Sequence, residues 1–180
     1  MAPRNSVFIA TSLDGFIADK EGGIDWLHTS PNPDQNDMGY SAFLSNVDAI
    51  VMGRVTFETV LGFGIPWPYS IPVFVLSTTL KLIPNELEEK VFLVSGELPE
   101  VLKTIHKKGL YRLYIDGGST IQGFLSEDLI DEMVITVIPI LLGEGVPLFS
   151  KLKGPINFAC KSSQRFLDCV VQNHFVRAKQ

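Results

Sequence analysis

The stretch that decides the fold runs Ile50-Val51-Met52-Gly53-Arg54-Val55-Thr56-Phe57-Glu58. Its first residues are apolar and predict a buried strand, and the chain then turns at Gly53 into a polar segment of helical character. A helix that begins at such a turn leaves its first backbone N–H groups unpaired, and these suit an anion such as a phosphate. Arg54 adds a positive charge there and Thr56 a hydroxyl. An ordinary strand-to-helix turn with a solvated Arg54 is the alternative interpretation.

A second corner of the same kind lies downstream, in Leu113-Tyr114-Ile115-Asp116-Gly117-Gly118-Ser119-Thr120-Ile121. Its two glycines permit a close approach of the backbone to a ligand. Ser119 and Gln122 fit a capping box, so a turn that only caps its own helix is the competing interpretation. Two phosphate-binding corners in one small chain suggest a bound dinucleotide. The usual Rossmann fingerprint, Gly-x-Gly-x-x-Gly, does not follow the first predicted strand.

A third polar turn follows the predicted strand that ends at Leu76. Ser77, Thr78 and Thr79 come directly after it, and Lys81 is close in sequence. Hydroxyls at the carboxyl end of a strand suit the 2′-phosphate of an adenosine ribose, whereas a site for the unphosphorylated ribose usually carries Asp or Glu. The pattern therefore favours NADP over NAD, with an ordinary polar turn as the alternative.

Composition sets the broad class. The chain has 180 residues, 46% of them hydrophobic, and a net charge of −5 without a basic stripe. We expect one domain over residues 1–180, no nucleic-acid partner and no membrane span, because no apolar run reaches the roughly 18 residues that a span needs. The start of the chain lacks a signal-peptide pattern, which predicts a cytoplasmic protein.

The sequence gives no signal for a disulfide framework, a metal site or a serine-hydrolase elbow. Cys160 and Cys169 are too few for a disulfide framework, so we expect buried, reduced thiols, with a pair across a hairpin as the alternative. The three histidines are far apart and no Cys/His pair has ligand spacing, so no metal is expected. A Gly-x-Ser-x-Gly elbow, the signature of many serine hydrolases, is absent from the sequence.

The order of predicted elements defines the fold class. Strands are predicted at 6–12, 48–52, 71–76, 91–94, 111–116, 131–138, 156–167 and 169–177, and helices at 39–46, 97–108 and 119–126. Strands and helices alternate through residue 126, which predicts an α/β fold with a largely parallel sheet. The last two strands form an antiparallel hairpin around Leu167-Asp168, so the sheet is mixed. Ser95 is the expected cap of the 97–108 helix, and Gly109 its stop.

Six segments together resemble the dihydrofolate reductase-like superfamily. They are Ser12-Leu13-Asp14-Gly15-Phe16-Ile17-Ala18, Ile24-Asp25-Trp26-Leu27, Met52-Gly53-Arg54-Val55-Thr56-Phe57-Glu58, Val75-Leu76-Ser77, Asp116-Gly117-Gly118-Ser119, and Leu141-Leu142-Gly143-Glu144-Gly145-Val146-Pro147-Leu148-Phe149. They occur in the family's order and cover nearly the whole chain. The chain looks closest to the branch that holds the reductase domain of riboflavin biosynthesis and many small stand-alone reductases.

The resemblance implies a mixed, mainly parallel sheet flanked by helices, with NADPH lying across the carboxyl ends of the strands. It also implies a homodimer. The residues that it assigns to the cofactor are Ala10, Ile17, Gly53, Arg54, Thr56, Leu76, Ser77, Thr78, Gly117, Gly118, Ser119 and Thr120.

One departure from the family concerns the substrate. Dihydrofolate reductases carry an acid on the first helix, where this chain has Met38, Gly39 or Tyr40, while Asp37 stands slightly early. Dihydrofolate is therefore not the expected substrate. Asp116, at a place where an acid contacts substrate in the riboflavin branch, and Asp14 are the catalytic candidates.

These features predict hydride transfer from NADPH to a C=O or C=N bond of a small polar acceptor such as a pterin or a ribosylamino-pyrimidine. Asp14 and Asp116 would orient the acceptor or relay a proton, and Trp26 would form a wall of the substrate pocket. The alternative is a non-catalytic NADP-binding or sensing module on the same fold.

Overall fold

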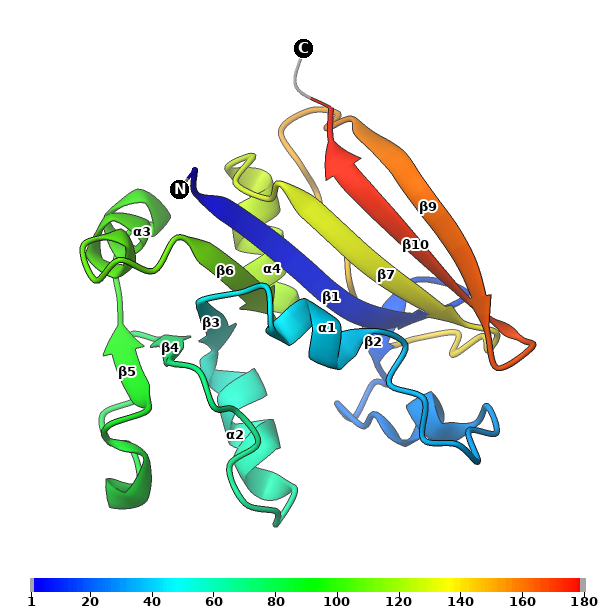
Figure 1. The fold of residues 1–180 in the computed structure, drawn as a ribbon, viewed down its shortest axis with the longest axis horizontal. Coiled ribbons are helices and arrows are strands. Elements are labelled where there is room, and N and C mark those ends of the chain that lie inside the picture. The colour runs from blue at the N-terminus through cyan, green and yellow to red at the C-terminus, as the bar shows by residue number, and fades with distance from the viewer. Residues whose placement is uncertain (1, 179–180) are drawn as a thin grey trace.

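A computed structural model describes residues 2–178 and contains a mixed eight-stranded sheet with helices on both faces (Figure 1). The strand order is β5-β4-β3-β6-β1-β7-β10-β9, and β2 and β8 form a separate small sheet. The strands are β1 (Arg4–Ser12), β2 (Phe16–Ala18), β3 (Ala49–Gly53), β4 (Val73–Leu76), β5 (Val91–Val94), β6 (Arg112–Asp116), β7 (Glu132–Ile138), β8 (Val146–Pro147), β9 (Phe158–Phe166) and β10 (Val170–Arg177). The helices are α1 (Tyr40–Leu44), α2 (Arg54–Gly62), α3 (Leu98–His106) and α4 (Gly118–Ser126), with 3-10 turns η1 (Asp25–His28) and η2 (Asn85–Leu87).

The predicted fold class is confirmed. Strands β5, β4, β3, β6, β1 and β7 pair in parallel in that order. Strand β10 then pairs antiparallel with β7, and β9 pairs antiparallel with β10. β3 is an interior strand between β4 and β6 and is buried on both faces up to Met52, which explains its unbroken apolar run. The β9–β10 turn has left-handed backbone at both Leu167 (φ 49°) and Asp168 (φ 57°), the conformation of a type I′ hairpin.

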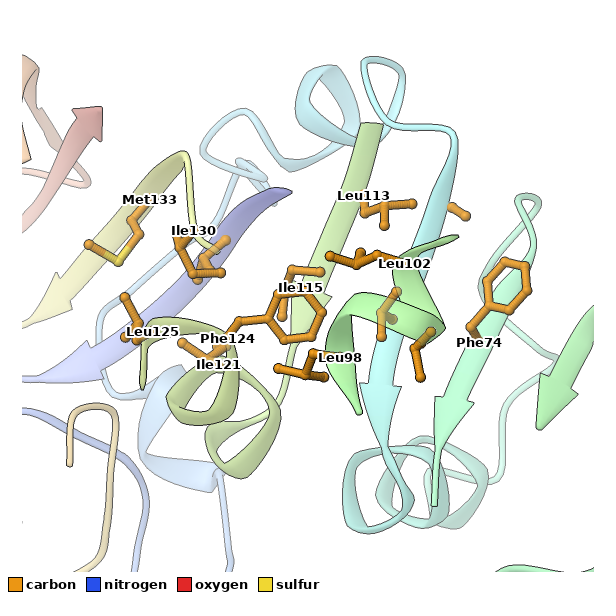
Figure 2. Close-up of a cluster of buried hydrophobic side chains, with 14 of the residues drawn as sticks. Phe74, Leu98, Leu102, Leu113, Ile115, Ile121, Phe124, Leu125, Ile130 and Met133 are labelled. Carbon is orange, nitrogen blue, oxygen red and sulfur yellow. The ribbon is translucent and has the colours of Figure 1, made fainter. Parts of the chain in front are cut away.

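Two apolar layers cover the sheet. On one face, α3 and α4 pack against the central strands, and the predicted stripe of α3 (Leu98, Val101, Leu102 and Ile105) is buried there. Figure 2 shows Leu98 and Phe124 converging on Ile115 of β6. The other face is covered by α1 and α2 with an aromatic layer, in which Phe57 is buried. Because side chains alternate along a strand, Tyr114 and Asp116 belong to the second face.

Several local expectations are wrong. The N-cap of α3 is Glu97 rather than Ser95, and it makes no side-chain capping bond. The capping box at the start of α4 does not form either, because Gly117 is its N-cap and the Gln122 amide instead donates to the Pro147 carbonyl at 2.8 Å. Cys160 and Cys169 are unpaired, as expected, but exposed rather than buried, since both belong to the outer hairpin region.

The sequence pattern also missed the small elements β2, β8, η1 and η2, which are too short for a periodic signal. Within residues 2–178, the helices are all too short, at nine residues or fewer, to cross a membrane.

Candidate nucleotide-binding and active site

The two glycine corners, Gly53-Arg54 and Gly117-Gly118, lie side by side. β3 and β6 pair in parallel with Met52 opposite Asp116, so the next residues on each strand, Gly53 and Gly117, begin α2 and α4 next to each other. A Cβ at Gly53 would lie 2.9 Å from the Thr120 hydroxyl, and a Cβ at Gly117 would overlap the Thr56 hydroxyl. Only glycine therefore lets the two helix starts approach this closely.

Both helix starts have donors available. The N-caps Gly53 and Gly117 have no side chain, so neither makes a side-chain capping bond to its helix. The first-turn N–H groups of these two nine-residue helices are therefore available to solvent or a ligand. The positive ends of both helix dipoles also meet at this place. This arrangement suits a pyrophosphate.

Arg54 is the first residue of α2. Its guanidinium Nη1 lies 2.6 Å from Glu58 Oε2, an i to i+4 ion pair on the exposed side of the helix. The Arg54 side chain is 42% exposed. The helix thus holds a solvent-accessible cation beside the two corners.

The third predicted turn lies in line with the corners. β4 pairs with β3 so that Leu76 is opposite Gly53, and Ser77 follows at the same edge of the sheet. The Ser77 hydroxyl accepts bonds from the Thr79 and Leu80 N–H groups at 3.1 and 3.0 Å, while Thr78 is exposed. The sheet order β4-β3-β6 therefore places the three turns in one row.

The sheet opens next to this row. Strand β1 pairs with β6 only from Arg4 to Ser6 among the described residues, and then continues to Ser12 along β7 alone. Beyond the split, the Tyr114 hydroxyl donates to the Phe8 carbonyl at 2.9 Å. Ile17 of β2 lies against Gly118, where its Cδ1 would be 2.8 Å from an added Cβ. The fold thus brings Ile17 to the predicted phosphate site.

Asp116 ends β6 at this opening. Its Oδ1 accepts the Gly117 N–H at 2.9 Å. Burial raises the pKa of its carboxyl to about 6, although the Gly117 N–H and the Tyr114 hydroxyl act in the opposite direction. Burial and the Asp116 charge together raise the pKa of Tyr40 to about 12 and that of Tyr69 further. A carboxyl with this pKa can exchange a proton near neutral pH.

Asp14 has a different environment. Its carboxylate accepts the Ser12 hydroxyl at 2.6 Å and the Gly143 N–H at 2.8 Å, and the Leu142 N–H adds a longer bond. The Ser12 bond is the main cause of its lowered pKa. These contacts tie the 12–16 turn to the 140–143 loop, so they favour a structural role and the ionised form. The catalytic role of Asp14 stays a prediction.

A cleft of about 470 Å³ lies on the α1 face of the sheet, and we call it the Ala10 cleft. The residues that line it are Phe8, Ala10, Leu27, His28, Ser30, Pro31, Asn32, Asp37, Met38, Thr136, Ile138, Leu167 and Val170. Among the predicted site residues, Ala10 alone belongs to this lining. Trp26 is buried behind it, packed with Ile138 and Val170, so it supports the wall rather than forming it.

Sequence reasoning missed most of this lining. The cleft combines β1, the 27–38 segment, β7 and the tip of the β9–β10 hairpin, and these are far apart in the chain. The one available signal was Asp37, the acid that stands close to the position expected from the family.

The chain matches the RibD C-terminal domain over residues 6–171, and it belongs to that family. A crystal structure of a Shewanella sp. PV-4 protein assigned to riboflavin biosynthesis is 54% identical, covers 99% of this chain and 100% of its own, and has a TM-score of 0.95.

Two more distant structures show the same fold. The deaminase/5-amino-6-(5-phosphoribosylamino)uracil reductase of Thermotoga maritima is 15% identical with a TM-score of 0.76, over 98% of this chain and 57% of the larger protein. The dihydrofolate reductase of Enterococcus faecalis, in complex with NADP(H), is 18% identical with a TM-score of 0.69, over 98% and 97% of the two chains. The fold is therefore reductase-like and dihydrofolate reductase-like.

Proposed function

We propose that this protein is an NADPH-dependent reductase that transfers hydride to a C=O or C=N bond of a small polar acceptor, pterin-like or ribosylamino-pyrimidine-like. The observation that carries the proposal is the pair of uncapped helix starts, α2 and α4, side by side and in line with the Ser77 turn. Membership of the RibD C-terminal domain family and the fold shared with an NADP(H)-binding reductase support it.

The residues present fit a dinucleotide phosphate. The missing side chains of Gly53 and Gly117 let the two helix starts approach each other, with the Thr56 hydroxyl against Gly117. The first-turn N–H groups of α2 and α4 would bind the pyrophosphate there, with Arg54 as the cation. Ser77 and Thr78 would bind the 2′-phosphate. Ala10 and Ile17 would contact the nicotinamide end, as the family resemblance implies.

When bound, NADPH supplies the hydride, and the protein's part is to orient the acceptor and exclude water. Asp116 can hold a proton at its carboxyl near neutral pH, so it is our preferred proton relay. The Ala10 cleft would hold the acceptor, because Ala10 is both a lining residue and a predicted cofactor contact.

The test is a titration of the protein with NADPH, followed by a panel of pterins, ribosylamino-pyrimidines and simple carbonyls while NADPH absorbance is recorded. We expect binding of NADPH and its oxidation by one acceptor class. Binding without oxidation across the panel would favour the non-catalytic NADP-binding or sensing module. Absence of NADPH binding would refute both functions.

We also propose that the protein acts in the cytoplasm as a homodimer. The edge strand β9 is exposed along most of its length, and large apolar side chains such as Leu141 and Phe149 are exposed elsewhere. Light scattering at micromolar concentration should give twice the monomer mass, and a monomer mass would reject this assembly.

A further inference from the structure

The Ala10 cleft has a distinctive charge. Its lining is aliphatic, aromatic or neutral polar, apart from the carboxylate of Asp37 and the imidazole of His28. Among the described lining residues there is no lysine and no arginine. Asp37 is therefore the one acidic residue among the described residues that line the cleft.

The Asp37 carboxylate is fixed in place. Its Oδ1 accepts the Gly39 N–H and its Oδ2 the Ser41 N–H, each at 2.9 Å, at the start of α1. The contacts with Ser41 and Gly39 lower the pKa of Asp37, so the group is ionised near neutral pH. A second carboxyl, Asp116, lies on the same face of the sheet.

Thr136 and Gln172 contribute neutral polar groups at the walls of the cleft, and both are hydrogen-bonded. The Thr136 side chain is buried, and its Oγ1 accepts the Gln172 amide at 3.0 Å, which leaves its own hydroxyl hydrogen to donate. The same Gln172 amide donates to the Met38 carbonyl at 3.0 Å and so joins the two walls. Arg165 of the same hairpin is not among the lining residues, and its exposed side chain lies 3.4 Å from Asp168.

We propose that the Ala10 cleft selects an acceptor without a phosphate group, a planar and neutral or cationic heterocycle that carries N–H donors. This inference rests on the proposed function and names its substrate class. A phosphate that enters the cleft loses hydration, meets the Asp37 charge and gains no arginine or lysine partner. The cleft thus distinguishes phosphorylated from unphosphorylated acceptors by repulsion of the phosphate as well as by contacts with the heterocycle.

The test compares a ribosylamino-pyrimidine nucleoside with its 5′-phosphate, by calorimetric titration into NADPH-saturated protein. We expect the nucleoside to bind more tightly by at least about tenfold, which is the ratio that 1.4 kcal/mol corresponds to. Asp37→Asn should reduce this ratio by weakening repulsion of the phosphate. Asp34→Asn is the matched control, because it removes the same charge from the same loop outside the cleft lining, and it should leave the ratio unchanged.

A second variant covers the case in which Asp37→Asn fails to fold. His28→Arg adds a cation at an exposed lining position and should increase affinity for the 5′-phosphate while sparing the nucleoside. Equal or tighter binding of the phosphate by the wild-type protein would overturn the inference. Binding of neither compound by a protein that still binds NADPH would also overturn it, whereas loss of NADPH binding would refute the proposed function itself.

Discussion

Replacement of Arg54 by alanine tests the proposed phosphate site most directly. In the free protein Arg54 is half-exposed and paired with Glu58 on its own helix, and an i to i+4 pair of this kind contributes about 0.3–0.5 kcal/mol. A hydrogen bond to a charged group contributes about 1.5–3 kcal/mol. If Arg54 gives up the Glu58 pair for a hydrogen bond to a cofactor phosphate, NADPH binding gains about 1–2.5 kcal/mol. We therefore expect Arg54→Ala to raise the dissociation constant by about 5- to 70-fold.

The assay is a fluorescence titration with NADPH at fixed ionic strength, because salt screens a partly exposed ion pair. Glu58→Ala is the matched control, since it removes the intrahelical partner but keeps the cation, and it should leave the affinity equal or slightly higher. A dissociation constant unchanged in Arg54→Ala, with the fold intact by circular dichroism, would refute the assignment of Arg54 to the cofactor.

Three further predictions concern the corners and the titratable groups. Gly117→Ala should lower the unfolding free energy by about 1–3 kcal/mol, because its φ is +90° and the added methyl would overlap Thr56. Gly62→Ala, with open space and helical backbone, should be neutral or slightly stabilising in the same thermal melt. Asp116→Asn should stabilise the protein at pH 8 by about 1–3 kcal/mol. The pKa of the Asp116 carboxyl is about 6 in the folded protein and about 3.9 in the unfolded chain, so the wild-type protein loses stability as pH rises from 4 through 6. Equal urea midpoints of the two proteins at pH 8 would contradict this. The Arg112 guanidinium donates to the Asp48 carboxylate at 2.6 Å, and this bond is the main cause of the Asp48 pKa of about 2. The stabilisation that ionised Asp48 gives the fold is therefore present above pH 4 and is lost as pH falls through 2. Asp48→Asn should cost about 1–2 kcal/mol of unfolding free energy at pH 7 after allowance for partial exposure, and urea unfolding at pH 2 should show a smaller difference.

The sequence predicts an element well where the pattern lies within that element. The apolar run before Gly53, the stripe from Leu98 to Ile105 and the hairpin at Leu167-Asp168 each follow from periodicity or from turn chemistry, and all three elements exist as predicted. Helix caps were predicted less well. Ser95 and the Ser119/Gln122 box satisfy the sequence pattern, but a cap depends on the residue at which the helix begins, and the N-caps are Glu97 and Gly117 instead.

The candidate site likewise has features that the sequence predicts and features that only the tertiary structure decides. Sequence alone determined the three polar turns and their chemistry, because each turn is a contiguous motif at a strand end. Only the tertiary structure decided that Gly53 lies beside Gly117, that β1 separates from β6 after Ser6, and that Asp37 shares a cleft with Ala10. The reason is physical. Strand order and register arise from burial of side chains far apart in the chain, so no local pattern encodes which strand ends become neighbours.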